Sequence, residues 1–210
     1  MSVVIESDAL VLFQGDSITD NGRSRKNDRE LGGGYAMMSA GLFSALFPGK
    51  NVRFLNRGVS GDGIADLQRR WDQDCLHLKP TWVSILIGIN DTWNRYKHNR
   101  GVSAEAFEAI YRDILVRMRD QTAARLILCE PFLLPTPQDR LQWRQDLDPK
   151  IDVVRRLARE FEAILVPFDG LFAAASCRTD PAFWAEDGVH PTHAGDALMA
   201  RAWLQAVGAL

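Results

Sequence analysis

Short apolar runs that end at a glycine or a polar cluster recur along this chain of 210 residues. One covers residues 11–14 and leads into Gly15-Asp16-Ser17, and the clearest covers residues 82–87 and leads into Gly88-Ile89-Asn90-Asp91. Runs bounded in this way are typical of buried parallel strands that present polar groups at their carboxyl ends. Similar runs predict further strands at residues 52–56, 125–130 and 163–167.

Between these runs, the spacing of apolar positions predicts helices. Ile64, Leu67, Trp71 and Cys75 recur every three or four residues, which places them on one helical face. The predicted helices cover residues 35–47, 64–78, 103–121, 141–162, 171–175 and 191–207, and Pro149 is expected to mark a break or a start within the fourth. Strands alternating with helices predict an α/β fold with a mostly parallel five-stranded sheet, formed by residues 1–210 as one domain.

Two charged segments, residues 18–33 and 93–101, are predicted to be loops. The first ends in Gly32-Gly33-Gly34, and a charged loop of this length is usually either functional or mobile. The glycines match neither of the two glycine-rich patterns that bind nucleotide phosphates, so backbone flexibility is the simpler interpretation.

Composition excludes several classes of protein. Apolar residues make up 46% and charged residues 25%, as in ordinary globular domains. A formal net charge of −2 provides no basic surface for nucleic acid or for an anionic membrane, and we expect neither partner. No apolar run approaches the roughly 20 residues that a membrane span needs.

The N-terminus and the cysteines indicate an intracellular protein. Glu6 and Asp8 stand where a secretory signal would have basic residues and a long apolar segment, so we expect a cytoplasmic location. Cys75, Cys129 and Cys177 are odd in number and far apart, which predicts buried, reduced thiols rather than a disulfide framework or a metal knuckle.

The segment Asp187-Gly188-Val189-His190-Pro191 carries a carboxylate and an imidazole three residues apart. A turn at Gly188 brings the carboxylate to one ring nitrogen and leaves the other nitrogen to act as a base. Taken alone, this motif also fits an Asp-Gly turn before a helix, and Gly15-Asp16-Ser17 alone also fits a tight turn that leads to a helix cap.

The combination of motifs decides between these interpretations, because a parallel sheet brings its strand ends to one edge. A serine hydroxyl becomes a nucleophile when a neutral imidazole takes its proton and a carboxylate stabilises the imidazolium. Ser17, His190 and Asp187 fit these roles. The backbone N–H groups of Ser17 and Gly61 and the side-chain amide of Asn90 are candidates for the oxyanion hole.

These motifs resemble the four sequence blocks of the SGNH (GDSL-type) serine esterases and lipases. The blocks, in the family's order and across nearly the whole chain, are Gly15-Asp16-Ser17-Ile18-Thr19-Asp20, Asn56-Arg57-Gly58-Val59-Ser60-Gly61, Gly88-Ile89-Asn90-Asp91 and Asp187-Gly188-Val189-His190-Pro191. The resemblance implies a three-layer α/β/α, flavodoxin-like fold and the same catalytic roles for the residues named above. It implies no metal, no organic cofactor and assembly as a homo-oligomer.

Within that family, the sequence looks most like intracellular carbohydrate acetylesterases that act on acetylated xylo-oligosaccharides. We therefore expect a cytoplasmic serine esterase that removes short acyl groups, above all acetyl, from small carbohydrate esters through an acyl-enzyme. Asp16, Tyr35, Trp93 and Trp184 are the expected substrate contacts. The three aromatic residues lie next to the family blocks, where their rings either stack on a sugar or pack in the core.

Other functions keep some support from the sequence. A thioesterase or lysophospholipase of the same family is the nearest alternative, and the apolar residues 132–134 leave a longer acyl chain open. A catalytically silent α/β ligand-binding domain is the alternative of another class. His190 and His193 with Asp187 are a possible but sparse metal ligand set. A Gly-x-Ser-x-Gly elbow is absent, which argues against an α/β-hydrolase.

Overall fold

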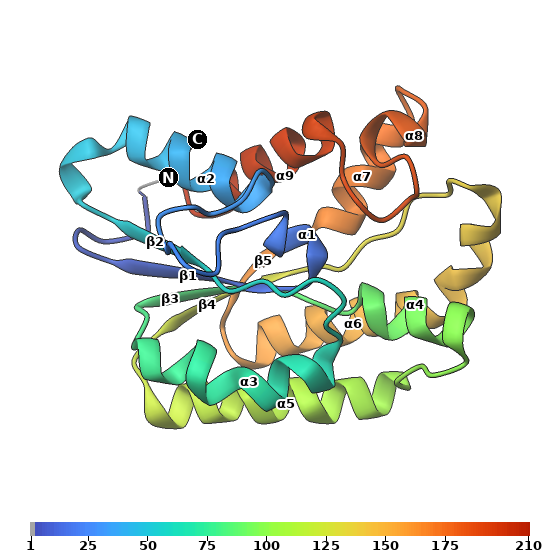
Figure 1. Ribbon diagram of the computed structural model, residues 1–210, viewed down its shortest axis with the longest axis horizontal. Coiled ribbons are helices and arrows are strands. Elements are labelled where there is room, and N and C mark those ends of the chain that lie inside the picture. Colours follow the sequence, from blue (N-terminus) through green and yellow to red (C-terminus); the bar gives the residue numbers. More distant parts are fainter. Residues whose placement is uncertain (1–2) are drawn as a thin grey trace.

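A five-stranded sheet with helices on both faces forms the centre of the molecule (Figure 1). The computed structural model describes residues 3–210. Its strands lie in the order β2-β1-β3-β4-β5, and all four neighbouring pairs are parallel. They are β1 (Leu10–Gly15), β2 (Arg53–Asn56), β3 (Trp82–Leu86), β4 (Arg125–Cys129) and β5 (Ile164–Val166). The predicted α/β fold with a five-stranded parallel sheet is confirmed.

The helices divide into two layers. The α-helices are α1 (Ser17–Asp20), α2 (Tyr35–Leu46), α3 (Ile64–Asp74), α4 (Ile89–His98), α5 (Ala104–Gln121), α6 (Arg144–Glu160), α7 (Phe168–Ser176), α8 (Pro181–Trp184) and α9 (His193–Ala206). Short 3₁₀ helices are η1 (Pro48–Lys50), η2 (Leu76–Leu78) and η3 (Gln138–Trp143). Helices α2, α7 and α9 cover one face of the sheet, and α3, α5 and α6 cover the other (Figure 1).

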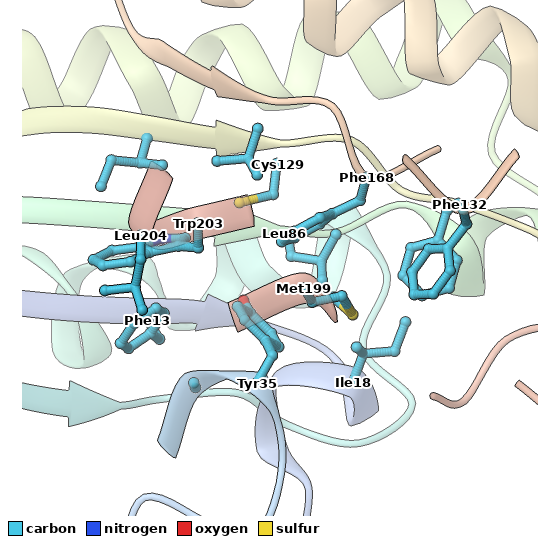
Figure 2. Close-up of a cluster of buried hydrophobic side chains, with 14 of the residues drawn as sticks. Phe13, Ile18, Tyr35, Leu86, Cys129, Phe132, Phe168, Met199, Trp203 and Leu204 are labelled. Carbon is cyan, nitrogen blue, oxygen red and sulfur yellow. The ribbon is translucent and has the colours of Figure 1, made fainter. Parts of the chain in front are cut away.

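Alternation along each strand supplies both layers of core. Val11 and Phe13 of β1 pack with the α2, α7 and α9 side, whereas Leu12 packs with the α3, α5 and α6 side. Every residue of β1 is buried, which explains why this strand appears in the sequence as an unbroken apolar run. Figure 2 shows the first of these clusters, in which Phe13 and Trp203 lie side by side with ring centroids 5.3 Å apart.

Helix α4 occupies most of the segment 93–101 that the sequence predicted to be a loop. The buried residues of this helix are Ile89, Asp91 and Thr92, two of which are polar. Ile89, Trp93 and Tyr96 do form an apolar stripe that packs against the core, but it is short and stands among charged and polar residues that are typical of a loop. The prediction of a loop at 93–101 was wrong for this physical reason.

Thr92 and Arg95 of α4 bind a buried carboxylate of α6, Asp146, which is paired with Lys150 of the same helix. Lys150, which is fully buried, lies with its Nζ 2.5 Å from Asp146 Oδ2, and the Thr92 hydroxyl donates to the same carboxylate over 2.8 Å. Arg95 donates to the other carboxylate oxygen over 2.9 Å. A buried charge needs such partners, because an unpaired charge in the interior is costly.

Helix α6 continues through Pro149, so the expected break is not observed. Proline at this position removes the hydrogen bond that its N–H would have given to the carbonyl of Gln145. Both residues are exposed, and water can hydrogen-bond to the carbonyl that loses its partner. The long first loop is also shorter than predicted, because α1 occupies residues 17–20.

Two further features bear on the sequence predictions. Cys75 and Cys129 are buried as expected, but Cys177 is exposed, which corrects the expectation for that thiol. No helix among residues 3–210 is both long and apolar enough to cross a bilayer.

Candidate active site

Ser17 stands at the carboxyl end of β1, as the first residue of α1. The strand passes very close to its neighbour there: a Cβ on Gly15 would lie 2.3 Å from the carbonyl oxygen of Leu86. Asp16 then caps α1 by accepting the N–H of Ile18 over 3.0 Å. The chain changes from strand to helix within two residues, which places Ser17 just beyond the carboxyl end of β1.

The structure brings Ser17, His190 and Asp187 into one hydrogen-bonded relay. Ser17 Oγ lies 2.9 Å from His190 Nε2, and His190 Nδ1 lies 2.7 Å from Asp187 Oδ2. The second carboxylate oxygen accepts the backbone N–H groups of Val189 and His190 over 2.9 and 2.8 Å. These contacts hold the carboxylate in place and leave Nε2 facing the serine, as a base for that hydroxyl requires.

Gly188 allows the turn that joins the carboxylate to the imidazole. Its φ is +81°, and a Cβ at this position would lie 2.2 Å from the carbonyl oxygen of Thr136. The same close approach lets the N–H of Leu134 donate to the carbonyl of Gly188 over 2.9 Å. The turn is therefore docked on the segment that follows β4.

Arg140 supports this turn from the side. Its Nε donates to the carbonyl of Asp187 over 3.2 Å, and its guanidinium lies 4.1 Å from the ring centroid of Trp143 and 5.1 Å from that of Trp93. The side chain is almost entirely buried. Sequence reasoning did not select Arg140, and an arginine in a polar stretch offers no signal for such a role.

The pKa values of the relay follow from these contacts. Partial burial alone would raise the pKa of Asp187, but hydrogen bonds from the His190 ring and from the N–H groups of His190 and Val189 outweigh it and lower the pKa to about 2. The hydrogen bond and charge of Asp187 raise the pKa of His190 above its ordinary value of 6.5, against the opposing effect of partial burial. The pair therefore favours a stable carboxylate beside a readily protonated ring.

Gly61 and Asn90 lie in the loop after β2 and in the first turn of α4. The backbone N–H groups of Ser17 and Gly61 have no hydrogen-bond acceptor among residues 3–210. The side-chain amide of Asn90 donates one N–H to the carbonyl of Asp62 over 3.0 Å, which fixes the amide and leaves its second N–H for another acceptor. These are the properties that donors to a developing oxyanion need.

Buried carboxylates tie the donor segments to each other. Asp91, beside Asn90, accepts the N–H of Ile64 at the start of α3 over 3.1 Å. Asp20 accepts both the N–H and the hydroxyl of Ser60, each over 3.0 Å. Burial raises the pKa of Asp91 to about 7, opposed by the N–H of Ile64 and by the charge of Lys150. Asp91 was not selected from the sequence, although its place beside Asn90 was a usable signal.

Two of the four expected substrate contacts are in the interior, which corrects the prediction for both. Asp16 is fully buried: its Oδ2 has no hydrogen-bond partner among residues 3–210, and burial raises its pKa to about 7. Tyr35 is also fully buried, with its hydroxyl 3.2 Å from Thr19 Oγ1. Figure 2 shows Tyr35 among the apolar side chains of the core.

Of the other two, Trp93 lies near the relay and Trp184 faces elsewhere. Trp93 is half-buried, and its ring centroid lies 6.3 Å from that of His190. Trp184 lines a surface hollow with residues of α7 and α9, among them Leu171 and Leu198, which does not fit the predicted contact with substrate. Contact between Trp93 and a substrate stays a prediction.

A hollow of about 540 Å³ adjoins the acid–base end of the relay. It is lined by Asn21, Glu186, Asp187, His190, Pro191, Thr192, His193 and Asp196. His193, which the sequence suggested as a possible metal ligand, is exposed at the start of α9, in the predicted first turn. Within residues 3–210 no cluster of three or more His, Cys, Asp or Glu side chains could hold a metal ion.

An α/β/α fold that joins a serine, an imidazole and a carboxylate at the edge of its sheet is an arrangement of serine hydrolases. The chain belongs to the GDSL-like lipase/acylhydrolase family, whose model matches residues 13–198. Over 97% of its length it is 36% identical to an acetylxylan esterase of Geobacillus stearothermophilus, of which it covers 96%.

Solved structures agree with this assignment. A Parabacteroides merdae protein assigned as a GDSL-like lipase superposes with a TM-score of 0.94, at 34% identity over all of both chains. Axe2, an acetylxylan esterase from Geobacillus stearothermophilus, superposes with a TM-score of 0.88 at 34% identity, over 97% of this chain and 96% of that one. Three Axe2 structures are of catalytic mutants in which alanine replaces a serine, an aspartate, or a histidine three residues after that aspartate.

Proposed function

We propose that the protein is a serine esterase that removes short acyl groups, above all acetyl, from carbohydrate esters such as acetylated xylo-oligosaccharides. The observation that carries this proposal is the relay from Ser17 through His190 to Asp187, with contacts of 2.9 and 2.7 Å. The catalytic mutants of Axe2 support it further, because their aspartate and histidine have the spacing of Asp187 and His190.

The proposed reaction begins when Ser17 Oγ attacks the acyl carbonyl carbon and its proton passes to His190 Nε2. The carbonyl oxygen becomes an oxyanion and accepts hydrogen bonds from the N–H groups of Ser17 and Gly61 and from the amide of Asn90. The bond to the sugar oxygen then breaks, and His190 gives its proton to that oxygen. Water attacks the acyl-enzyme by the same route, releasing the acid and restoring Ser17.

A short acyl group fits the apolar surface near the site. Phe132, Leu133 and Leu134, the residues that left a longer chain open, have exposed fractions of only 0, 6 and 2%. Phe132 belongs to the core, and the apolar hollow of about 320 Å³ that Leu133 and Leu134 line does not include Ser17, Asp187 or His190 among its lining residues. It is therefore not a groove that continues from the nucleophile, as a long acyl chain requires. This favours an acetylesterase over a lysophospholipase of the same family.

We expect the sugar of the substrate to bind at the surface beside His190, next to Trp93. Trp93 offers a half-buried aromatic ring there, and its position is fixed by Trp143 in a T-shaped contact with centroids 5.3 Å apart. An aromatic face held in this way suits the apolar face of a sugar ring. The alcohol product of the reaction is therefore expected to leave from the Trp93 side.

The deciding experiment is a screen of acetylated xylo-oligosaccharides, aryl acetates of increasing acyl length and acyl thioesters. We expect fastest turnover with acetyl esters and none above background for Ser17→Ala, whose circular dichroism should match the wild type. Turnover that survives in Ser17→Ala would contradict the assignment. A preference for thioesters would select the related thioesterase function, and a Ser17 that resists a fluorophosphonate probe would favour a silent binding domain.

Location and assembly belong to the same proposal. A cytoplasmic enzyme is consistent with the activity on oligosaccharides rather than on polymers, and self-association follows from the resemblance to family members that assemble. Light scattering coupled to size-exclusion chromatography measures the second point directly.

A further inference from the structure

The guanidinium of one arginine, Arg70, hydrogen-bonds to several of the chain segments that carry the active-site residues. Arg70 lies on α3, and its Nε donates to Asp62 Oδ2 over 2.7 Å. Its Nη1 donates to the side-chain oxygen of Gln14 and to the carbonyl of Arg57, each over 2.8 Å. Its Nη2 donates to the carbonyl of Gly15 over 3.1 Å.

The acceptors of Arg70 adjoin all three proposed oxyanion donors. Gly15 is two residues before Ser17, Asp62 follows Gly61, and the carbonyl of Asp62 accepts the amide of Asn90 over 3.0 Å. The guanidinium therefore connects the end of β1, the loop after β2 and, through Asp62, the start of α4. No other arginine among residues 3–210 donates to two backbone carbonyls that flank this site.

The chemistry of arginine suits this position. A guanidinium has five N–H donors in a rigid plane, so it can satisfy acceptors on different segments at fixed angles. The side chain of Arg70 is only 16% exposed and that of Asp62 only 14%, which limits competition from water. The neighbouring Arg69 differs in both respects, since its side chain is 72% exposed and pairs with Asp66 on its own helix.

We propose that Arg70 is a positioning residue of the esterase, which sets the placement of the Gly61 N–H and the Asn90 amide relative to Ser17. This inference rests on the proposed function, because it assigns these groups to an oxyanion hole. Oxyanion donors accelerate a reaction only when they are oriented before the charge develops. A displacement of about 1 Å by a change outside the reacting groups can cost roughly 10²-fold in rate.

The test compares Arg70→Met with Arg69→Met, a matched loss of one positive charge at the adjacent position. With an aryl acetate, we expect Arg70→Met to lower kcat about 10²-fold with little change in KM. Arg69→Met should retain the wild-type kcat. Arg70→Lys keeps the charge without the planar fork and should rescue little of the loss. A wild-type kcat in Arg70→Met would overturn the inference.

A double-mutant cycle distinguishes positioning from a general structural role. If Arg70 acts through the oxyanion donors, Arg70→Met should cost much less kcat in an Asn90→Ala background than in the wild type. If the fold-loss in kcat of the double variant equals the product of the two single fold-losses, Arg70 acts independently of Asn90, and the proposal is contradicted. The acid limb of the pH profile should stay in place, since the His190 relay is not altered.

Folding is controlled by a second variant. Arg70→Met leaves the carboxylate of Asp62 without its main partner, so Arg70→Met/Asp62→Asn removes that unpaired charge. We expect the double variant to recover thermal stability but not kcat, because Gln14, Gly15 and Arg57 still lack the guanidinium that joins them. Recovery of kcat together with stability would overturn the inference.

Failure of the proposed function gives a different result. A wild-type protein without Ser17-dependent turnover would remove the esterase assignment and this role with it. A wild-type protein that turns over, beside a fully active Arg70→Met, would remove only the role of Arg70. A crystal structure of Arg70→Met adds a measure independent of turnover: we expect the Gly61 amide to move, and an unmoved amide would contradict the proposal.

Discussion

The two sides of the site are held in opposite ways. On the oxyanion side, Asp91 is 2% exposed, and the side chains of Arg70 and Asp62 are 16% and 14% exposed. On the acid–base side, the side chains of His190 and Asp187 are 49% and 40% exposed. A charge-assisted network with little exposure therefore holds the segments that carry the donors, although Gly61 itself is exposed, whereas the base and its carboxylate are themselves half exposed.

This difference matches what each side has to do. The donors stay uncharged throughout the reaction, so they gain from rigid placement before the charge develops. The imidazole is protonated and deprotonated twice in each cycle, and full burial would depress its pKa by penalising the charged form. The hydrogen bond and the charge of Asp187 raise the pKa of His190 above 6.5, and because the ring is only partly buried, desolvation does not reverse this shift.

The largest effect should come from Asp187→Asn. An amide in place of the carboxylate holds the ring in the wrong tautomer and cannot stabilise the imidazolium, so kcat should fall about 10⁴-fold. Steady-state hydrolysis of an aryl acetate measures this loss. Glu186→Gln is the matched control, since it removes an exposed acid from the adjacent position and should change kcat little. A small loss in Asp187→Asn would show that the exposed side is not the acid–base side.

A smaller loss is expected for Asn90→Ala on the buried side. Removing one oxyanion donor should lower kcat by about 10²- to 10³-fold with a modest effect on KM. Asn94→Ala, one turn further along α4, serves as the control and should behave as wild type. If the two variants have equal rates, Asn90 is not part of the oxyanion hole.

The smallest effect is a displacement of the pH profile. The base works only when it is neutral, and its pKa is raised above 6.5, so kcat/KM should fall as pH drops through a midpoint above 6.5. The residual activity of Asp187→Asn should have a lower midpoint, because the ring loses the carboxylate that favours its charged form. A wild-type midpoint below 6.5 would contradict the geometry of the relay.

The convergence of distant residues was predictable because it follows from topology. Ser17 and His190 are separated by 173 positions, yet parallel strands and the loops after them share one edge of the sheet. The direction of each side chain near that edge was not predictable. Tyr35 begins α2, and its ring turns into the core because α2 packs against α9.

The supporting network was hidden from the sequence for another reason. Two acceptors of Arg70 are the carbonyls of Gly15 and Arg57, and every residue carries a carbonyl whatever its side chain. Helix α4 escaped prediction because its buried face combines Asp91 and Thr92 with a short apolar stripe of Ile89, Trp93 and Tyr96. Polar groups that are buried for positioning leave no hydrophobic pattern along the chain.

Because α4 is attached to α6 through Thr92, Asp146 and Lys150, its buried and exposed residues should tolerate substitution to different degrees. Its inward side is locked by a charged interior, so Asn90 keeps its orientation when outward residues are exchanged. Trp93 belongs to this fixed part, because its ring packs on Trp143 and lies next to the Arg140 guanidinium that binds the Asp187 turn. Evolution toward new sugars, or a saturation library, is expected to change exposed residues at the end of α4, such as His98 and Asn99, and to retain Trp93.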